Sequence, residues 1–262
     1  AEGRESVGTC FVGPVLIGEI MFHPPDLGDA TDNSADEYIE LWNGSADNIP
    51  LFDPHHPACT WRMRGGVDFD FPANITLAGG ECILLVNFDP AETAALSAFR
   101  SKYGVDASVR LFGPYSGRLN NSGEEVRLQK PTVLDSDVVA YVLMDEVGYR
   151  DTAPWPDGAD GSGLSLQRIA PHAYGNEPAS WIAASPWIGR SLVPTLVIHV
   201  QPLAFLLEWE DSPLIWDLEE ATELATPMNW QASATAPVFS NGYWHAAVPR
   251  STAGSTYFRL RT

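Results

Sequence analysis

Two stretches of sequence decide the fold: VLIGEIMFHPP at residues 15–25 and EYIELWN at residues 37–43. Both are short and rich in branched and aromatic side chains, and the second alternates between polar and apolar residues, which is typical of β-strands. The first stretch ends in the HPP of residues 23–25 and the second is followed by Gly44, and prolines and glycines stop strands. These stretches therefore predict two β-strands joined by an acidic loop at residues 26–36.

Similar segments continue along the whole chain, around a single helical signal. Residues 91–103 are rich in helix formers, follow Asp89-Pro90 and precede Gly104, which favours a helix with defined ends. The remaining segments are short, and 21 Pro and 22 Gly separate them. The sequence predicts an all-β fold with one short helix. The other predicted strands are residues 60–64, 68–71, 82–87, 108–112, 125–129, 137–143 and 163–169, then 195–200, 204–210, 214–219, 229–232, 243–248 and 257–261.

The length and a local change in composition predict two domains. A chain of 262 residues exceeds the roughly 100 to 150 residues of most single domains. Residues 171–189 are rich in Pro, Ser, Asn and Trp without periodicity, as expected of a covering tail and linker. We therefore predict an N-terminal extension at residues 1–12, a β-sandwich with its covering tail at 13–189, and a small β-sandwich at 190–262.

The chain is strongly acidic, with 34 Asp and Glu against 15 Lys and Arg, a net charge of -19. Nucleic-acid binding needs a basic surface, so the sequence argues against a nucleic-acid partner and favours cation binding. Of the 34 acidic residues, 27 precede residue 190, so a cation site is expected in the first domain. The longest apolar stretch, residues 193–207, contains Pro194 and His199 and is shorter than the roughly 18 residues of a membrane span.

Six short motifs follow one another in the first domain: GEIMFHPP at 18–25, EYIELWN at 37–43, a strand around Trp61, DFDFP at 68–72, LNNSGEEV at 119–126, and WP at 155–156 leading to GSGLSLQR at 161–168. In this order they resemble bacterial lamin tail domains, and the resemblance covers about residues 13–187. It implies an immunoglobulin-like β-sandwich. Gly18 and Trp42 depart from the Asn and Tyr that are usual in the family. The tryptophans and the YFRL end of residues 209–260 resemble, more loosely, a β-sandwich module of secreted proteins of Planctomycetes and Verrucomicrobia.

The motifs of common catalytic sites are absent: no GxSxG, HExxH, CxxC or GxxxxGK[ST] occurs. Glu19 and Glu40 lie on strands that can pair, which suggests a carboxylate dyad or, as the simpler interpretation, structural acids or acids that support a nearby cation site. His55 and His56 are adjacent on a proline-bounded loop, where neighbouring side chains point apart. We therefore predict a protein that is not an enzyme.

The acidic loop after the first strand is the strongest candidate for a metal site. Its oxygen-bearing groups suit calcium, which takes six to eight oxygen ligands in a flexible geometry. The spacing differs from that of an EF-hand, and a solvated acidic loop without an ion is the alternative. A second acidic turn, with Asp157 and Asp160, is a separate candidate. The predicted calcium ligands are Asp26, Asp29, Asp32, Asn33, Asp36 and Glu37.

Three cysteines, Cys10, Cys59 and Cys82, allow one disulfide and leave one thiol over. Cys59 and Cys82 lie in the same predicted sandwich, whereas Cys10 lies in the terminal extension. We predict a Cys59–Cys82 disulfide, with three free thiols as the alternative.

These features predict a secreted or cell-surface protein, since a chain that starts at Ala1 fits the removal of a signal peptide, although it fits a trimmed chain equally well. Its function is predicted to be that of a non-enzymatic adhesion, scaffold or envelope-associated module. Its partners would be proteins or glycans at the cell surface, or further copies of the chain paired through strand edges. One alternative is a carbohydrate-binding module that serves an extracellular hydrolase, with Trp155, Trp181 and Trp187 as surface candidates. Another is a metal-dependent hydrolase that uses Glu19, Glu40 and the acidic loop.

Overall fold

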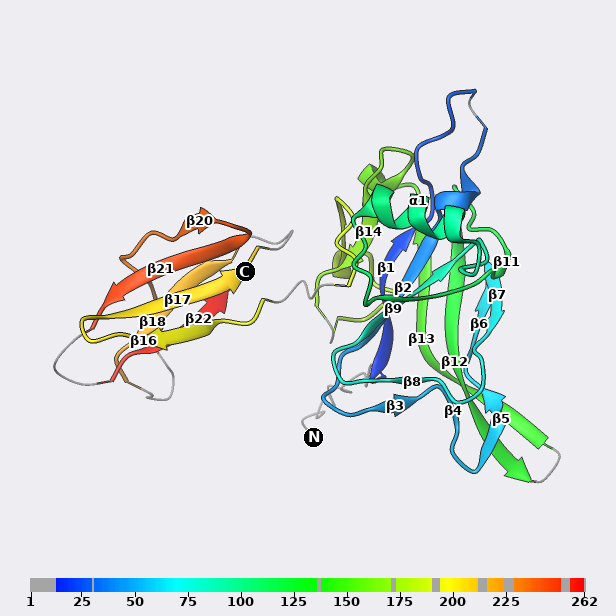
Figure 1. The fold of residues 1–262 in the computed structure, drawn as a ribbon, viewed down its shortest axis with the longest axis horizontal. Helices are drawn as coiled ribbons and strands as arrows, with labels where there is room; N and C mark the ends of the chain where they lie inside the picture. The colour runs from blue at the N-terminus through cyan, green and yellow to red at the C-terminus, as the bar shows by residue number, and fades with distance from the viewer. Residues whose placement is uncertain are drawn as a thin grey trace, which may run out of the picture. The chain divides into compact units, whose positions relative to one another are not determined.

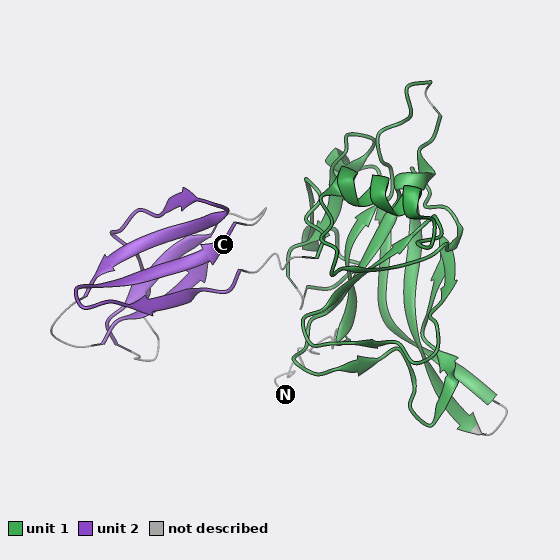
Figure 2. Cartoon of the chain, viewed as in Figure 1, with its two compact units in different colours: residues 1–190 green, residues 191–262 purple. Residues whose placement is uncertain are grey.

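The computed structural model describes residues 13–29, 31–135, 138–170, 173–189, 194–211, 216–223, 229–250 and 255–261. The predicted extension at residues 1–12, with Cys10, lies outside the described residues. The chain divides into two compact units, residues 1–190 and 191–262 (Figure 2). The described elements are strands, three 3-10 turns and one α-helix, so the predicted all-β fold is confirmed (Figure 1). Within these residues, no helix has the length and apolar character needed to cross a membrane.

The first unit contains a six-stranded sheet that is antiparallel except for one pair. β9 and β10 run parallel, and the two strands predicted from the decisive stretches, β1 and β2, lie at the centre. In order across the sheet, the strands are β10 (Arg110–Phe112), β9 (Cys82–Val86), β2 (Tyr38–Asn43), β1 (Val15–Met21), β14 (Ser165–Arg168) and β15 (Trp181–Ala184).

A five-stranded antiparallel sheet packs against the first. Its order is β11 (Ser116–Gly117), β7 (Val67–Asp70), β6 (Arg62–Gly65), β12 (Gly123–Asp135) and β13 (Val138–Arg150). β12 and β13 form a long hairpin that continues past the end of the sheet (Figure 1). Two short ladders complete the unit: β3 (Ile49–Pro50) with β8 (Thr76–Leu77), and β4 (Phe52–Asp53) with β5 (His56–Thr60).

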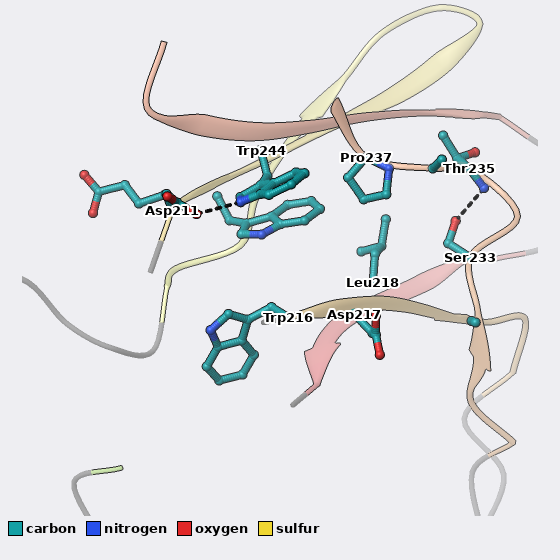
Figure 3. Close-up of a pocket in the computed structure, with 12 residues that line it drawn as sticks. Asp211, Trp216, Asp217, Leu218, Ser233, Thr235, Pro237 and Trp244 are labelled. Carbon is teal, nitrogen blue, oxygen red and sulfur yellow. Dashed lines mark hydrogen bonds between the residues drawn. The ribbon is translucent and has the colours of Figure 1, made fainter. Parts of the chain in front are cut away.

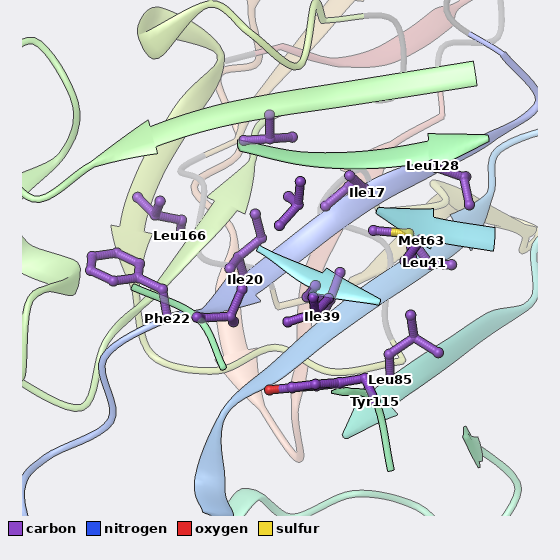
Figure 4. Packing of buried hydrophobic residues seen from close by; sticks show 14 of the residues in the cluster. Ile17, Ile20, Phe22, Ile39, Leu41, Met63, Leu85, Tyr115, Leu128 and Leu166 are labelled. Carbon is purple, nitrogen blue, oxygen red and sulfur yellow. The ribbon is translucent and has the colours of Figure 1, made fainter. Parts of the chain in front are cut away.

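The main core lies between these two sheets. Ile17 and Leu41 of the six-stranded sheet join one buried cluster with Met63 and Leu128 of the five-stranded sheet (Figure 4). The outer face of the six-stranded sheet is also buried, because α1 (Thr93–Tyr103) places Phe99 against it. β9 is therefore buried on both faces, which explains why its sequence, CILLV, is a continuous apolar run rather than an alternating one.

Successive side chains of β9 point to opposite faces of the sheet, and this explains why the predicted disulfide is not formed. Both Cys59 and Cys82 are free thiols. Cys82 shares a strand face with Leu84 and Val86, which pack in the cluster under α1. Cys59 lies on β5, whose contacts are with β4 and β12 on the other side of the sandwich. The two sulfur atoms thus belong to different layers, and the expectation based on a shared sandwich was wrong.

The second unit is a smaller pair of sheets. Its core contains Leu207, Trp209, Leu218, Ala246 and Val248, drawn from both sheets. The first sheet has the order β16 (Val197–Val200), β17 (Ala204–Glu210), β21 (Tyr243–Pro249), β20 (Val238–Ser240), and the second the order β19 (Gln231–Ala232), β18 (Asp217–Ala221), β22 (Tyr257–Arg261).

Candidate functional site

Part of the acidic loop gathers around His23, which follows β1. The ligand atoms of His23, Asp26 and Asp32 lie within 4.8 Å of one another. His23 Nδ1 is 2.5 Å from Asp160 Oδ1, so the two acidic turns predicted as separate candidates meet at this histidine. Partial burial lowers the pKa of His23, but its hydrogen bonds and charge interactions with Asp160 and Asp26 outweigh burial and leave the pKa raised.

The other predicted calcium ligands point elsewhere. Asn33 donates to Asp36 Oδ2 at 2.6 Å, and Asp36 forms an ion pair with Lys102 of α1. Asp29 is exposed and accepts a hydrogen bond from the backbone N–H of Thr31. These contacts fix the shape of the loop and do not converge on a point where one ion could sit.

Glu37 is fully buried, and its carboxylate is bonded by the segment at residues 115–119. Its Oε2 accepts hydrogen bonds of 2.9 Å from the hydroxyl of Tyr115 and the N–H of Leu119, while Oε1 finds no partner among the described residues. Burial raises the pKa of Glu37 to about 7, and the nearby charge of Asp32 adds to this. Glu37 therefore holds the 115–119 segment in place from the inside.

The six predicted ligands thus separate into several groups, and the sequence missed His23, which the HPP motif places beside Asp160. The remaining cluster offers one imidazole nitrogen and carboxylate oxygens, a donor set that suits a divalent cation. The described contacts compete with an ion, because Asp32 also accepts hydrogen bonds from Arg118 and Asn121. Calcium binding by this loop stays a prediction, now for Asp26 and Asp32 with His23.

We expect a divalent cation at about ten times its Kd to stabilise the protein by about 1.4 kcal/mol through mass action. Calorimetric titration and thermal melts with Ca²⁺, Mn²⁺ and Zn²⁺ measure this. Asp32→Asn should abolish the effect, and Asp29→Asn, in the same loop but outside the cluster, should preserve it. Equal binding by both variants, or no heat with any of the three ions, would leave the loop as surface charge.

The second candidate is the carboxylate pair of β1 and β2. Glu19 lies directly opposite Glu40, next to a bulge at Gly18, and a Cβ at Gly18 would lie 3.2 Å from Glu40 Oε1. Both glutamates are buried, at 2% and 5% exposed. Burial raises the pKa of Glu19 to about 7, against hydrogen bonds from Ser165, Tyr38 and Trp187 that lower it. Burial, and then the charge of Glu19, raise the pKa of Glu40 well above its usual range.

A covering segment at residues 185–189 closes over this pair. The backbone N–H of Gly189 donates to Glu40 Oε2 at 2.7 Å, and that of Trp187 lies 3.3 Å from Glu19 Oε2. Ser165 of β14 donates to Glu19 Oε1 at 2.6 Å. Both carboxyl groups are therefore held by the fold itself, in a place that a substrate does not reach without displacing the segment.

The third candidate is a hollow of about 340 Å³ in the second unit (Figure 3). Trp209 and Trp244, from β17 and β21, form part of its wall, and Trp216 and Leu218 lie on the side of β18. Trp244 Nε1 donates to Asp211 Oδ1 at 2.9 Å. The sequence did not single out this hollow, because its residues come from four separate segments of the unit.

The tryptophans predicted as surface candidates have a different role. Trp155 and Trp181 are 7% and 3% exposed, and their rings pack 6.2 Å apart in the main core. Trp187 is partly buried in the covering segment.

Comparison with known protein families, curated proteins and solved structures found no match for this chain. The chain is an all-β protein with two sandwich-like units, and these three places are its candidate sites.

Proposed function

We propose that the chain is a secreted or cell-surface, non-enzymatic adhesion or scaffold module of the lamin tail type that associates with a second copy of itself. The observation that carries the proposal is the free end of the β12–β13 hairpin. Five large apolar side chains are exposed there, by 39% to 63%: Leu134, Val138, Val139, Val142 and Leu143.

The backbone at the outer edge of β13 is also available for pairing near the hairpin end, over residues 138–143, whereas further along the strand the Gly148 N–H is bonded to Asn176. β13 is the last strand of its sheet, and among the described residues its only ladder is with β12. An exposed, apolar edge strand of this length is a template for pairing with another strand. Most protein surfaces avoid such an edge, so its presence supports an interface.

A second copy of the chain is the partner that suits the uncharged edge of β13. Residues 138–144, VVAYVLM, contain no charged side chain in a chain of net charge -19. Within residues 138–144, two such segments can pair antiparallel about a two-fold axis without placing charged side chains opposite each other. The apolar side chains on both faces of the hairpin would then lie against those of the partner.

The contacts of the glutamate pair support a non-enzymatic role. Glu19 and Glu40 are hydrogen-bonded by Ser165 and by the covering segment, which is the arrangement of structural acids. General acid–base catalysis requires a carboxyl group within hydrogen-bond reach of a substrate. The pair therefore supports a stabilising role more than a hydrolytic one.

Val142→Lys is expected to convert a dimer into a monomer, because a lysine on the edge would leave its charge desolvated in the paired sheet. Sedimentation velocity measures the change from about twice 28.5 kDa to 28.5 kDa. Leu27→Lys is the matched control, since Leu27 and Val142 are both 50% exposed and Leu27 lies in a loop. A monomeric unmodified chain at high concentration, or a dimeric Val142→Lys variant, would refute self-association through β13.

A further inference from the structure

The four-stranded sheet of the second unit ends in β16, a strand whose outer edge is open. β16 pairs with β17 on one side, and among the described residues it has no ladder on the other (Figure 1). Its apolar side chains are exposed, by 41% for Val197, 43% for Ile198 and 65% for Val200. Sheets usually protect such an edge with charges, prolines or bulges. The sequence of β16, VIHV, has no charged acid, lysine, arginine or proline, and its ladder with β17 has no bulge.

The backbone of β16 presents a regular set of outward hydrogen-bonding groups. The turn to β17 is closed by a bond of 2.9 Å from the N–H of Gln201 to the C=O of Ala204. Residue pairs of an antiparallel ladder alternate between those that bond across it and those that do not. The backbone groups of His199 therefore face β17, whereas those of Ile198 and Val200 face outward. Each of these two residues offers an N–H and a C=O to a further antiparallel strand.

The side chains of the same two residues continue the core side of the sheet beyond its last covered strand. Ile198 lies opposite Leu207 of β17, and Val200 lies opposite Phe205. Leu207 belongs to the core of the unit and Phe205 packs against it, and directly opposite residues of a ladder share a face of the sheet. A strand that pairs with β16 would therefore cover apolar side chains as well as backbone groups.

The edge of β16 is uncharged, which suits a second copy of the chain as its partner. Residues 191–207 contain no Asp, Glu, Lys or Arg, in a chain of net charge -19. Two copies can therefore meet here without placing like charges opposite each other. By contrast β22, an edge of the other sheet, carries Arg259 and Arg261, which both pair with Glu219. Charged side chains of this kind protect an edge against pairing.

We infer that two copies of the chain pair antiparallel through β16, and that this contact joins the β13 dimers proposed above into larger assemblies. When the two-fold axis passes beside His199, Ile198 of each copy lies opposite Val200 of the other. The outward backbone groups then bond one another, and the apolar side chains meet across the axis. β13 and β16 lie in different units, so each copy has two separate two-fold contacts. The larger assembly rests on the proposed function, whereas the β16 contact does not.

Sedimentation velocity on the full chain over a concentration series tests the inference. β16 has four residues and is the shorter edge, so we expect β13 dimers of about twice 28.5 kDa at low concentration and larger assemblies at high concentration. Val200→Lys places a charge in the seam between the two sheets and should stop assembly at the dimer at every concentration. Val200→Pro removes an outward N–H, keeps an apolar side chain and should have the same effect. Thermal melts confirm that each variant is folded.

Val238→Lys is the matched control, because Val238 is also 65% exposed and lies on β20, the opposite edge strand of the same sheet. This variant should assemble as the unmodified chain does. Growth of Val200→Lys past the dimer, or an unmodified chain that stops at the dimer, would overturn the inference. Equal losses in Val200→Lys and Val238→Lys would overturn the two-fold pairing, since β16 would then bind β20 of another copy.

Val142→Lys separates this inference from the proposed function. In this variant the step from monomer to dimer at low concentration should be lost, and only the β16 contact should remain, at high concentration. Adding Val200→Lys should then leave a monomer throughout. If Val142→Lys still dimerises at low concentration, the β13 contact is refuted alone. If Val142→Lys stays monomeric at every concentration, the β16 contact is overturned.

Discussion

Replacing Arg168 with alanine is expected to lower the free energy of unfolding of the first unit by about 3 to 5 kcal/mol. Arg168 of β14 forms two hydrogen bonds, of 2.7 and 2.9 Å, with Asp145 of β13, and the two side chains are 1% and 4% exposed. Asp145 also accepts the N–H of Ile17 at 2.8 Å, beside the bulge of β1. Without Arg168, the Asp145 charge would stay buried with one neutral donor, and burying an unpaired charge is among the costliest changes to a fold.

Urea denaturation followed by tryptophan fluorescence measures this loss. The control is Arg127→Ala: Arg127 bonds Glu146, the residue after Asp145, at 2.9 Å, but its side chain is 43% exposed. An exposed pair of this kind contributes about 0 to 1 kcal/mol. The double variant Asp145→Leu/Arg168→Met, which removes both charges, should recover much of the loss. A loss for Arg168→Ala as small as that for Arg127→Ala would show that the buried pair is not required.

The stability of the first unit is expected to fall by several kcal/mol between pH 5 and pH 9. Burial raises the pKa of Glu19 to about 7 and that of Glu40 well above its usual range. The folded chain thus holds protons that the unfolded chain has released above about pH 4.5. Folding is favoured while both glutamates are protonated, and this advantage is lost as the pH rises. For Glu19 alone the loss is about 3 kcal/mol. Glu37 contributes in the same direction.

Glu40→Gln tests the origin of this pH dependence. Glutamine keeps an oxygen that can accept the N–H of Gly189 and removes both the ionisation and the repulsion of Glu19. We expect the variant to be more stable than the unmodified chain at pH 9 and to show a clearly smaller fall from pH 5 to pH 9 in urea denaturation. Glu92→Gln, at an exposed position before α1, should leave the profile unchanged. If the Glu40→Gln and unmodified profiles coincide, the pair does not control the pH response.

The sequence predicted most strands because they are short apolar or alternating runs bounded by Gly, Pro and Asn. The predicted strands at residues 15–22 and 38–42 correspond to β1 and β2 almost to the residue. It missed most of the length of β12, predicted as residues 125–129 but extending to Asp135, because Lys130 and Pro131 interrupt the pattern. β6 pairs only with residues 126–129 of β12, so Pro131 lies where the strand has a partner on one side only.

The candidate sites were less accessible to sequence reasoning, because they depend on contacts between distant segments. His23 and Asp160 are 137 residues apart, and no local pattern joins them. The acidic composition of the loop predicted oxygen ligands but not which side chains would instead bind Lys102, Thr31 or Tyr115. The pairing of the Glu19 and Glu40 strands was foreseen, and the donors that enclose the two carboxyl groups were not.

The covering segment also determines how the first unit would carry mechanical load. A pull on the chain beyond residue 189 reaches this unit through Gly189 and Trp187, whose N–H groups are anchored on Glu40 and Glu19 of the central strands. Tension is thereby delivered into the middle of the six-stranded sheet before it reaches β15, a four-residue strand at the sheet edge. The hydrogen bonds to the two buried glutamates would thus bear the load first and keep the edge strand β15 from separating before the rest of the sheet.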